Sequence, residues 1–161
     1  MAACLSVEYS TLFANYVERG GGAVLFTQLA QDYAAACLVF APFQPWLADT
    51  SVTPPAAVDS TAATDLIRLL PNSPLLAGVS ITSVPSPTSL YPLILQAKTS
   101  VVAEVHVPAE GGITVNLPWL AELKQSATSG RVVQFAQYPV DDQLVRNAVH
   151  RVYRCTSLLT A

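Results

Sequence analysis

The sequence predicts a mostly β fold, an antiparallel β-sandwich with two or three short helices in its loops. First, short segments alternate apolar and polar residues, most clearly at 101–107, where Val101, Ala103, Val105 and Val107 share one face. Second, 12 prolines and 7 glycines divide the chain into short pieces. Third, turn residues separate these pieces at close intervals, which is typical of all-β domains.

Further strands are expected in the second half of the chain. Residues 75–84 alternate, with Val79 and Ile81 facing inward, and residues 90–97 are apolar on both faces, as in a central strand. A turn at 108–112 leads into a strand at 113–117. The stretch 131–138 should be another strand, with Val133 and Phe135 on one face.

The first half of the chain mixes strand, helix and loop patterns. Residues 5–17 fit either a strand or a helix ended by the glycines 20–22, and we favour the strand. The prolines predict a loop at 42–55. Residues 59–70 should form a short helix stopped by Pro71, with a buried face formed by Leu66, Leu69 and Leu70.

Two segments near the C-terminus have helical features. Pro118 suits the first position of a helix over 118–127. Residues 140–153 fit a helix and a strand almost equally, with Asp141 and Asp142 suited to a helix N-terminus or a turn. For residues 149–159, the Val, Tyr, Thr and Leu content favours a final strand.

Composition indicates one domain, residues 1–161, with a surface poor in charge. The chain is 52% apolar and 12% charged, against roughly 25% charged residues in average globular proteins. No apolar run is long enough for a membrane span, and no signal peptide is evident. Neighbouring subunits could cover the apolar surface; the alternative is a monomer with a surface rich in alanine and threonine. The net charge of −3 argues against a dedicated nucleic-acid binder.

We find no motif for catalysis, metal binding or a cofactor. The glycines 20–22 lack the lysine of a phosphate loop and should form a turn. The odd set Cys4, Cys37 and Cys155 indicates free thiols, with one disulfide as the alternative. Glu104 and His106 should share a strand face, either as a surface pair or as a pH-sensitive contact.

Six residues are candidates for contacts with other subunits, and they are Phe43, Trp46, Trp119, Arg146, Arg151 and Arg154. Phe43 and Trp46 fall in a proline-rich loop, where aromatic residues often anchor interfaces, although Trp46 and Trp119 could instead anchor the core. Half of the Lys and Arg residues lie near the C-terminus, where they could contact an acidic partner or form ion pairs on a solvated face; these are Arg131, Arg146, Arg151 and Arg154.

The second half resembles viral jelly-roll coat proteins. The predicted strands at 101–108, 113–118, 130–135 and 149–159 are similar to the last strands of that fold, and the Leu117-Pro118-Trp119 step is similar to one in picornavirus-like subunits. The resemblance implies a self-assembling shell located in the virion and assembled in the host cytoplasm. Residues 1–18 contain no Lys or Arg, unlike the basic arm of many such subunits, so the genome would be packaged by another protein.

The resulting hypothesis is a structural protein rather than an enzyme: a capsid, minor capsid or decoration subunit whose partners are itself and other shell subunits. It would have no cofactor, metal or small-molecule substrate. Two alternatives stay open. One is a β-sandwich binding module that recognises a ligand or peptide through the loop of Phe43 and Trp46. The other is an enzyme with a site built on Glu104, His106 and a serine.

Overall fold

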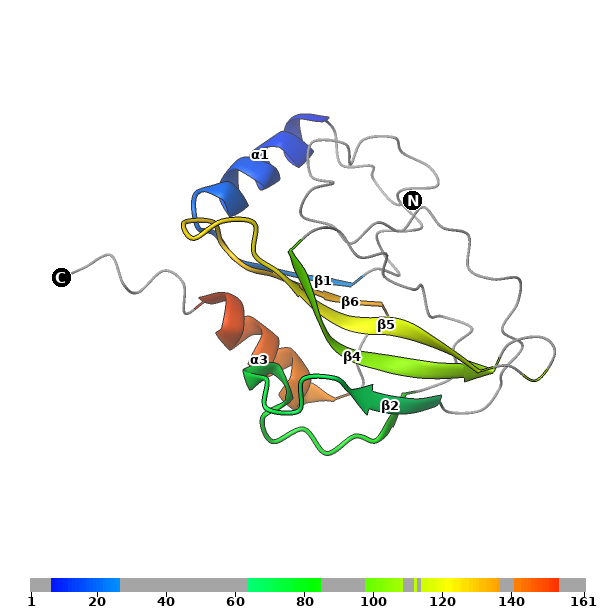
Figure 1. The fold of residues 1–161 in the computed structure, drawn as a ribbon. Helices are drawn as coiled ribbons and strands as arrows, with labels where there is room; N and C mark the ends of the chain where they lie inside the picture. Colours follow the sequence, from blue (N-terminus) through cyan, green and yellow to red (C-terminus); the bar gives the residue numbers. More distant parts are fainter. Residues whose placement is uncertain are drawn as a thin grey trace.

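A computed structural model describes residues 7–26, 64–84, 98–108, 112, 114–136 and 141–153. These residues are mostly β, with one curled, mixed sheet of six strands in the order β1-β6-β5-β4-β2-β3 and two α-helices (Figure 1). The strands are β1 (Ala23–Phe26), β2 (Thr64–Arg68), β3 (Ser83–Val84), β4 (Thr99–Pro108), β5 (Thr114–Leu123) and β6 (Val132–Phe135). The helices are α1 (Val7–Glu18), α3 (Asp142–Tyr153) and the short 3₁₀ helix η2 (Pro74–Leu76).

The mostly β prediction is confirmed, but the purely antiparallel pairing is wrong. Strands β1 and β6 are parallel, with Ala23 opposite Val132 and Phe26 opposite Phe135. Parallel neighbours need a long connection, and these two strands come from opposite ends of the chain. Alternation of apolar residues shows which side of a strand is buried, but it does not show the direction of its neighbour.

The strands predicted at 101–107 and 113–117 are confirmed in their described residues as β4 and β5, which pair antiparallel, and β5 is longer than predicted. Residues 99–108 pair with 114–123, and Gly112 in the turn has a φ of 75°. The predicted helix at 118–127 is wrong, because β5 continues to Leu123. Pro118 lies opposite Glu104, beside a register shift in the ladder, a position where the missing N–H of proline is tolerated. Hydrogen bonding to β4 and β6 on both sides makes β5 a central strand.

Strand β6 confirms the predicted strand at 131–138 over four of its residues. All four are buried, so both faces of the strand are covered. Val133 and Phe135 join the larger hydrophobic cluster, as predicted, whereas Val132 packs into the smaller one.

The strand favoured at 5–17 is wrong, because residues 7–18 form helix α1. Ala14 and Val17, three residues apart, are its buried side. The helix ends in a Schellman motif: Gly20 has a φ of +100° and donates to the Val17 carbonyl, and Gly21 donates to the Tyr16 carbonyl. The turn predicted for the glycines is therefore confirmed, and it stops the helix.

The helix predicted at 59–70 is wrong over its described part, because Thr64–Arg68 is strand β2. Leu66 is partly buried against the core, but Leu69 and Leu70 are 44% and 45% exposed. Pairing with β4 and with the 79–84 segment decides the conformation. The strand predicted at 75–84 is reduced to Ser83–Val84, since residues 74–76 form η2. Val79 is buried and Ile81 partly buried, as expected.

The helical interpretation of 140–153 is confirmed, and the final strand is wrong for residues 149–153. The Asp141 carboxylate accepts a hydrogen bond from the Leu144 amide at 3.0 Å, which caps the helix as predicted. Leu144, Ala148 and Val152 repeat every four residues and are buried. Residues 154–159 lie outside the described ranges, as do the predicted loop at 42–55 and the strand at 90–97.

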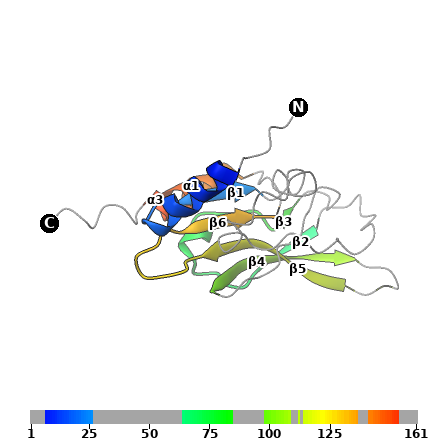
Figure 2. The same ribbon diagram turned by 90° about the horizontal axis from the view of Figure 1, so that it is seen from above.

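The two helices cover opposite faces of the sheet. In Figure 1, α1 lies above and α3 below the end formed by β1 and β6, and they overlap when seen from above (Figure 2). Helix α3 packs on the larger hydrophobic cluster, around Trp119 and Phe135, and α1 packs on a smaller cluster with Leu123 and Val132. Neither helix has the length and apolar character that a membrane span requires.

Glycines hold α1, the β5–β6 turn and α3 in close contact. The Gly130 amide donates to the Val17 carbonyl at 2.7 Å. A Cβ on Gly130 would lie 2.5 Å from the carbonyl carbon of Gly21 and 2.9 Å from that of Gly20. At Gly22, a Cβ would lie 2.5 Å from the Cβ of Val152 in α3. Backbones can approach this closely only where no side chain intervenes.

Asn147 should stabilise the contact between α3 and η2. Its Nδ2 donates to the carbonyl oxygens of Leu75 at 3.0 Å and Ala77 at 2.8 Å. Replacing Asn147 with alanine should lower the free energy of unfolding by about 1–2 kcal/mol, because both hydrogen bonds are lost. Urea denaturation followed by circular dichroism measures this loss. The control is His150→Ala on the exposed side of α3; an equal loss in both variants would mean that helix propensity, not the Asn147 contacts, determines the effect.

Candidate functional site

An open depression with a volume of about 450 Å³ lies where the 70–74 turn, β4, β5, the start of β6 and α3 meet. Its lining combines apolar side chains with polar and charged ones. The lining residues are Leu70, Pro71, Asn72, Ser73, Pro74, Ser100, Val102, Glu122, Arg131 and Arg151. Ligand sites usually have volumes of roughly 300–1,000 Å³, so the depression is large enough for a small molecule.

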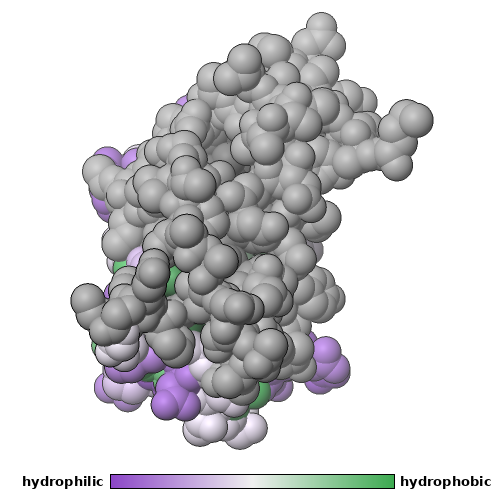
Figure 3. Space-filling model, turned by 90° about the vertical axis from the view of Figure 1, so that its right-hand side faces the viewer, coloured by the Kyte–Doolittle hydropathy of each residue, from purple (hydrophilic) through white to green (hydrophobic). Residues whose placement is uncertain are grey.

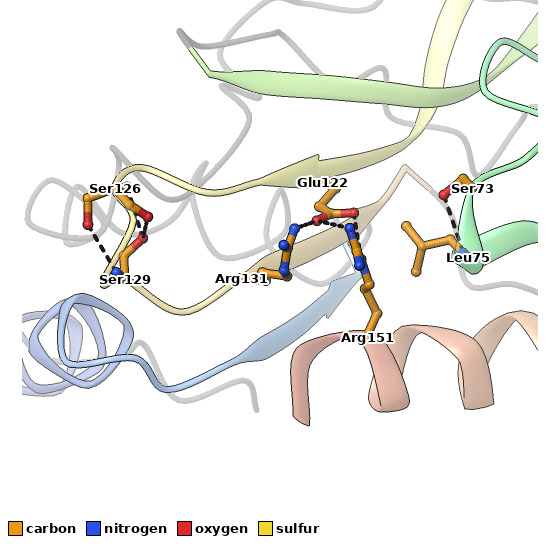
Figure 4. Close-up of polar contacts among 7 residues, drawn as sticks. All are labelled: Ser73, Leu75, Glu122, Ser126, Ser129, Arg131 and Arg151. Carbon is orange, nitrogen blue, oxygen red and sulfur yellow. Dashed lines mark hydrogen bonds and ion pairs between the residues drawn. The ribbon is translucent and has the colours of Figure 1, made fainter. Parts of the chain in front are cut away.

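A carboxylate held by two arginines lies on one side of the depression. Arg131 Nη1 donates to Glu122 Oε1. Arg151 binds the carboxylate through two nitrogens: Nε donates to Oε2 at 3.1 Å, and Nη2 lies 3.1 Å from Oε1. Figure 4 shows the guanidinium groups converging on Glu122, that of Arg131 from just before β6 and that of Arg151 from α3. The three side chains form the Glu122 cluster.

The sheet and α3 explain why these residues meet. In the β5 ladders, Glu122 lies between Ser100 of β4 and Val133 of β6. Arg131 directly precedes β6, and Arg151 is in the last turn of α3, where a cation is favoured by the helix dipole. Glu122 is only 9% exposed, and burying its carboxylate is compensated by the paired arginines.

The Glu122 cluster has one more positive than negative charge, because two guanidinium groups face one carboxylate. The Arg131 and Arg151 side chains are 22% and 30% exposed, against 10% for Glu122. An arginine has five N–H donors, and the bonds to Glu122 use only part of them. The arrangement is suited to binding an oxyanion. Both oxygens of the Glu122 carboxylate already contact the arginines.

The interface residues predicted from the sequence differ in their burial and in their contacts. Trp119 is 1% exposed and lies in the core, with its ring edge-on to Phe135 at 5.8 Å. Arg146 is on the exposed side of α3, and Arg151 belongs to the Glu122 cluster. Phe43, Trp46 and Arg154 lie outside the described residues. The intramolecular ion pairs proposed for the basic residues are confirmed for Arg131 and Arg151.

Other residues singled out in the sequence form no site with the Glu122 cluster. On β4, His106 is exposed and Glu104 is partly buried; the pH-sensitive contact between them stays a prediction. Within the described ranges, no group of three or more His, Cys, Asp or Glu side chains is arranged to hold a metal ion. All three cysteines lie outside those ranges.

Glu122 is not among the site residues predicted from the sequence, because its segment, 118–127, is predicted to be a helix. As part of a central strand, it is a single acidic residue within a buried apolar run, Trp119–Leu123. A carboxylate at such a position requires a partner. Had the strand been recognised, this requirement would have pointed to the basic residues near the C-terminus.

Exposed apolar residues form a second feature of the surface. Leu12 and Tyr16 of α1 are 64% and 53% exposed, and Val149 and Tyr153 of α3 are 48% and 76% exposed. Residues four apart lie on one side of a helix, so each helix presents an apolar pair to solvent. On the face shown in Figure 3, hydrophobic atoms of the described residues appear only in small areas among hydrophilic ones.

Comparisons of the chain with models of protein families, with curated proteins and with solved structures each gave no match.

Proposed function

We propose that this chain is a structural protein that assembles with further copies of itself through protein–protein contacts, and that it is not an enzyme. The observation that supports this most directly is the exposed apolar pair on each helix. A chain with only 12% charged residues has few charges with which to keep such surfaces hydrated. Exposed apolar residues that gather on one surface commonly mark contacts between proteins.

The outer side of α1 supplies the first contact surface. Leu12 and Tyr16 point away from the sheet, since Ala14 and Val17 are the buried residues of the same helix. The Phe13 ring, which is partly buried against the smaller hydrophobic cluster, lies 6.1 Å from that of Tyr16. Aromatic side chains are enriched in the cores of interfaces, which makes this surface the one we assign to contact with a second copy.

The second surface, formed by Val149 and Tyr153, is on α3 and therefore on the opposite side of the sheet. Two contact surfaces on opposite sides allow a head-to-tail interface, in which the α1 surface of one copy meets the α3 surface of the next. Such interfaces form rings or extended arrays instead of stopping at a dimer. This geometry supports a role in a larger assembly.

A narrower form of the proposal is a capsid, minor capsid or decoration subunit of a virion with a jelly-roll fold. It rests on the strand pattern in the sequence at 101–118 and 130–135 and on the low charge. The parallel pair of β1 and β6 departs from the antiparallel sheets of that family. Particles in electron micrographs of the purified protein would support this form.

The proposal predicts that the purified chain self-associates. Size-exclusion chromatography with light scattering at micromolar concentration should give a mass that is a multiple of 17.1 kDa. The double variant Leu12→Ser, Tyr16→Ser should shift the mass to 17.1 kDa, because the apolar contact is removed from two mostly exposed positions.

The matched control is Asn15→Ser, an exposed polar substitution on the same helix. Circular dichroism should show the same secondary structure in all variants. A wild-type mass of 17.1 kDa would contradict self-assembly, and a multimer that is unaffected by the double variant would exclude α1 as its contact surface.

A further inference from the structure

We propose that the depression beside the Glu122 cluster is a binding site for a small monocarboxylate with an apolar body. Self-assembly through the helices does not use this depression, so the two proposals are independent. The inference rests on the excess charge of the cluster, on the donors left on its two arginines, and on the mixed lining of the depression.

The charge of the cluster matches one carboxylate. Arg131 and Arg151 together supply two positive charges, and Glu122 neutralises one of them. No other charged residue is among the described residues that line the depression. A ligand with a single negative charge would bring the sum to zero. A phosphate dianion would leave an excess negative charge beside the largely buried Glu122 carboxylate, and so it is disfavoured.

The arginines keep donors for the ligand. Arg151 contacts Glu122 through Nε and Nη2, which leaves Nη1, and Arg131 contacts it through Nη1, which leaves Nε and Nη2. None of these remaining nitrogens is among the buried side-chain atoms that lack a partner. Both guanidinium groups are partly exposed and line the depression. Planar guanidinium groups are well matched to carboxylate oxygens.

The remaining lining fits an uncharged, partly apolar body. Leu70 is 45% exposed, and Pro71, Pro74 and Val102 extend the apolar part of the surface. Hydroxyl and amide groups of Ser73, Ser100 and Asn72 are available at the same surface. The Ser73 oxygen already accepts from the Leu75 amide at 3.3 Å, so its hydrogen is free to donate. A few polar groups within an apolar surface are typical of small-molecule sites.

The test is a titration of the full chain with sodium hexanoate, followed by NMR. The arginine Nε–Hε signals and the backbone amides of Ser73 and Ser100 should shift with one saturable curve. Equal concentrations of 1-hexanol, sodium chloride and inorganic phosphate should not reproduce these shifts. Hexanol tests whether the carboxylate is needed, and phosphate tests whether any oxyanion suffices.

Matched arginine variants locate the site. Arg151→Gln should weaken hexanoate binding about tenfold or more, because a charge-assisted contact is lost. Arg146→Gln changes the net charge equally on the exposed side of α3 and should leave the affinity unchanged. If Arg151→Gln does not fold, Ser100→Phe serves instead, because it fills the depression from an exposed strand position and keeps all three charges of the Glu122 cluster. Its control is Thr114→Phe, at the other end of the hairpin.

Several results would overturn the proposal. Absence of saturable hexanoate shifts at these signals would show that the depression does not bind carboxylates. Equal shifts with phosphate or hexanol would reject the assigned ligand class. Equal weakening by Arg146→Gln and Arg151→Gln would indicate a general charge effect. Loss of self-association would leave these measurements untouched, because they can be made on the Leu12→Ser, Tyr16→Ser variant.

Discussion

Replacing Gly130 with alanine should lower the free energy of unfolding by about 3 kcal/mol or more. The added Cβ would overlap the carbonyl of Gly21 and approach that of Gly20. A clash between two backbone segments cannot be relieved by a change of rotamer. Relief would instead require the β5–β6 turn to move away from the end of α1, which would break the 2.7 Å hydrogen bond from the Gly130 amide to Val17. Urea denaturation followed by tryptophan fluorescence measures the loss.

Gly112→Ala is the control for this substitution. Gly112 has a φ of +75°, but a Cβ there would meet nothing within 4 Å. Its cost should therefore be only that of a side chain in the left-handed region, about 1–2 kcal/mol. A Gly130→Ala variant that is no less stable than Gly112→Ala would mean that the two backbone segments can separate freely.

Replacing Glu122 with glutamine should lower the free energy of unfolding by about 2–3 kcal/mol. Removing one partner of a buried ion pair costs about 3–5 kcal/mol, and the partial exposure of the arginines reduces this. The substitution preserves the shape of the side chain but leaves two guanidinium groups beside each other without a carboxylate. Thermal and urea denaturation should both detect the loss, and added salt should reduce it by screening the repulsion.

Two further variants separate the ion pairs from other effects. Glu104→Gln, in the partly buried middle of β4, removes the same charge outside the cluster and should change stability by less than about 0.5 kcal/mol. The double variant Glu122→Gln, Arg151→Gln should lose less free energy of unfolding than the two single variants lose together. Each single variant already removes the interaction between these two side chains, so the double variant loses that interaction only once. Additive losses would contradict the coupling seen in the contacts.

Strands with one clear pattern could be predicted from the sequence, and segments decided by their neighbours could not. The alternation at 101–107 predicted β4, and the pattern at 131–138 predicted β6. In contrast, Thr64–Arg68 is a strand because β4 and the 79–84 segment supply its hydrogen bonds. Trp119–Leu123 follows a proline that favours a helix start, but pairing on both sides overrides that preference.

The candidate site could be predicted only in part. The concentration of arginines near the C-terminus drew attention to Arg131 and Arg151, and intramolecular ion pairs were one interpretation. Their shared partner could not be identified, because Glu122 is brought to them by the pairing of β5 with β6 and by the packing of α3. Likewise, Trp119 is a large aromatic residue that suits an interface or a core equally well, and only its neighbours decide that it is buried.

The parallel pair at the edge of the sheet has a consequence for synthesis on the ribosome. Ala23 pairs with Val132, 132 − 23 = 109 residues later. At about 5–20 residues per second, β1 emerges roughly 5–20 s before its partner strand exists. During that interval the apolar residues of α1 and β1 have neither β6 nor α3 to cover them. The nascent N-terminal segment therefore leaves apolar surface uncovered until the C-terminal part of the chain has been made.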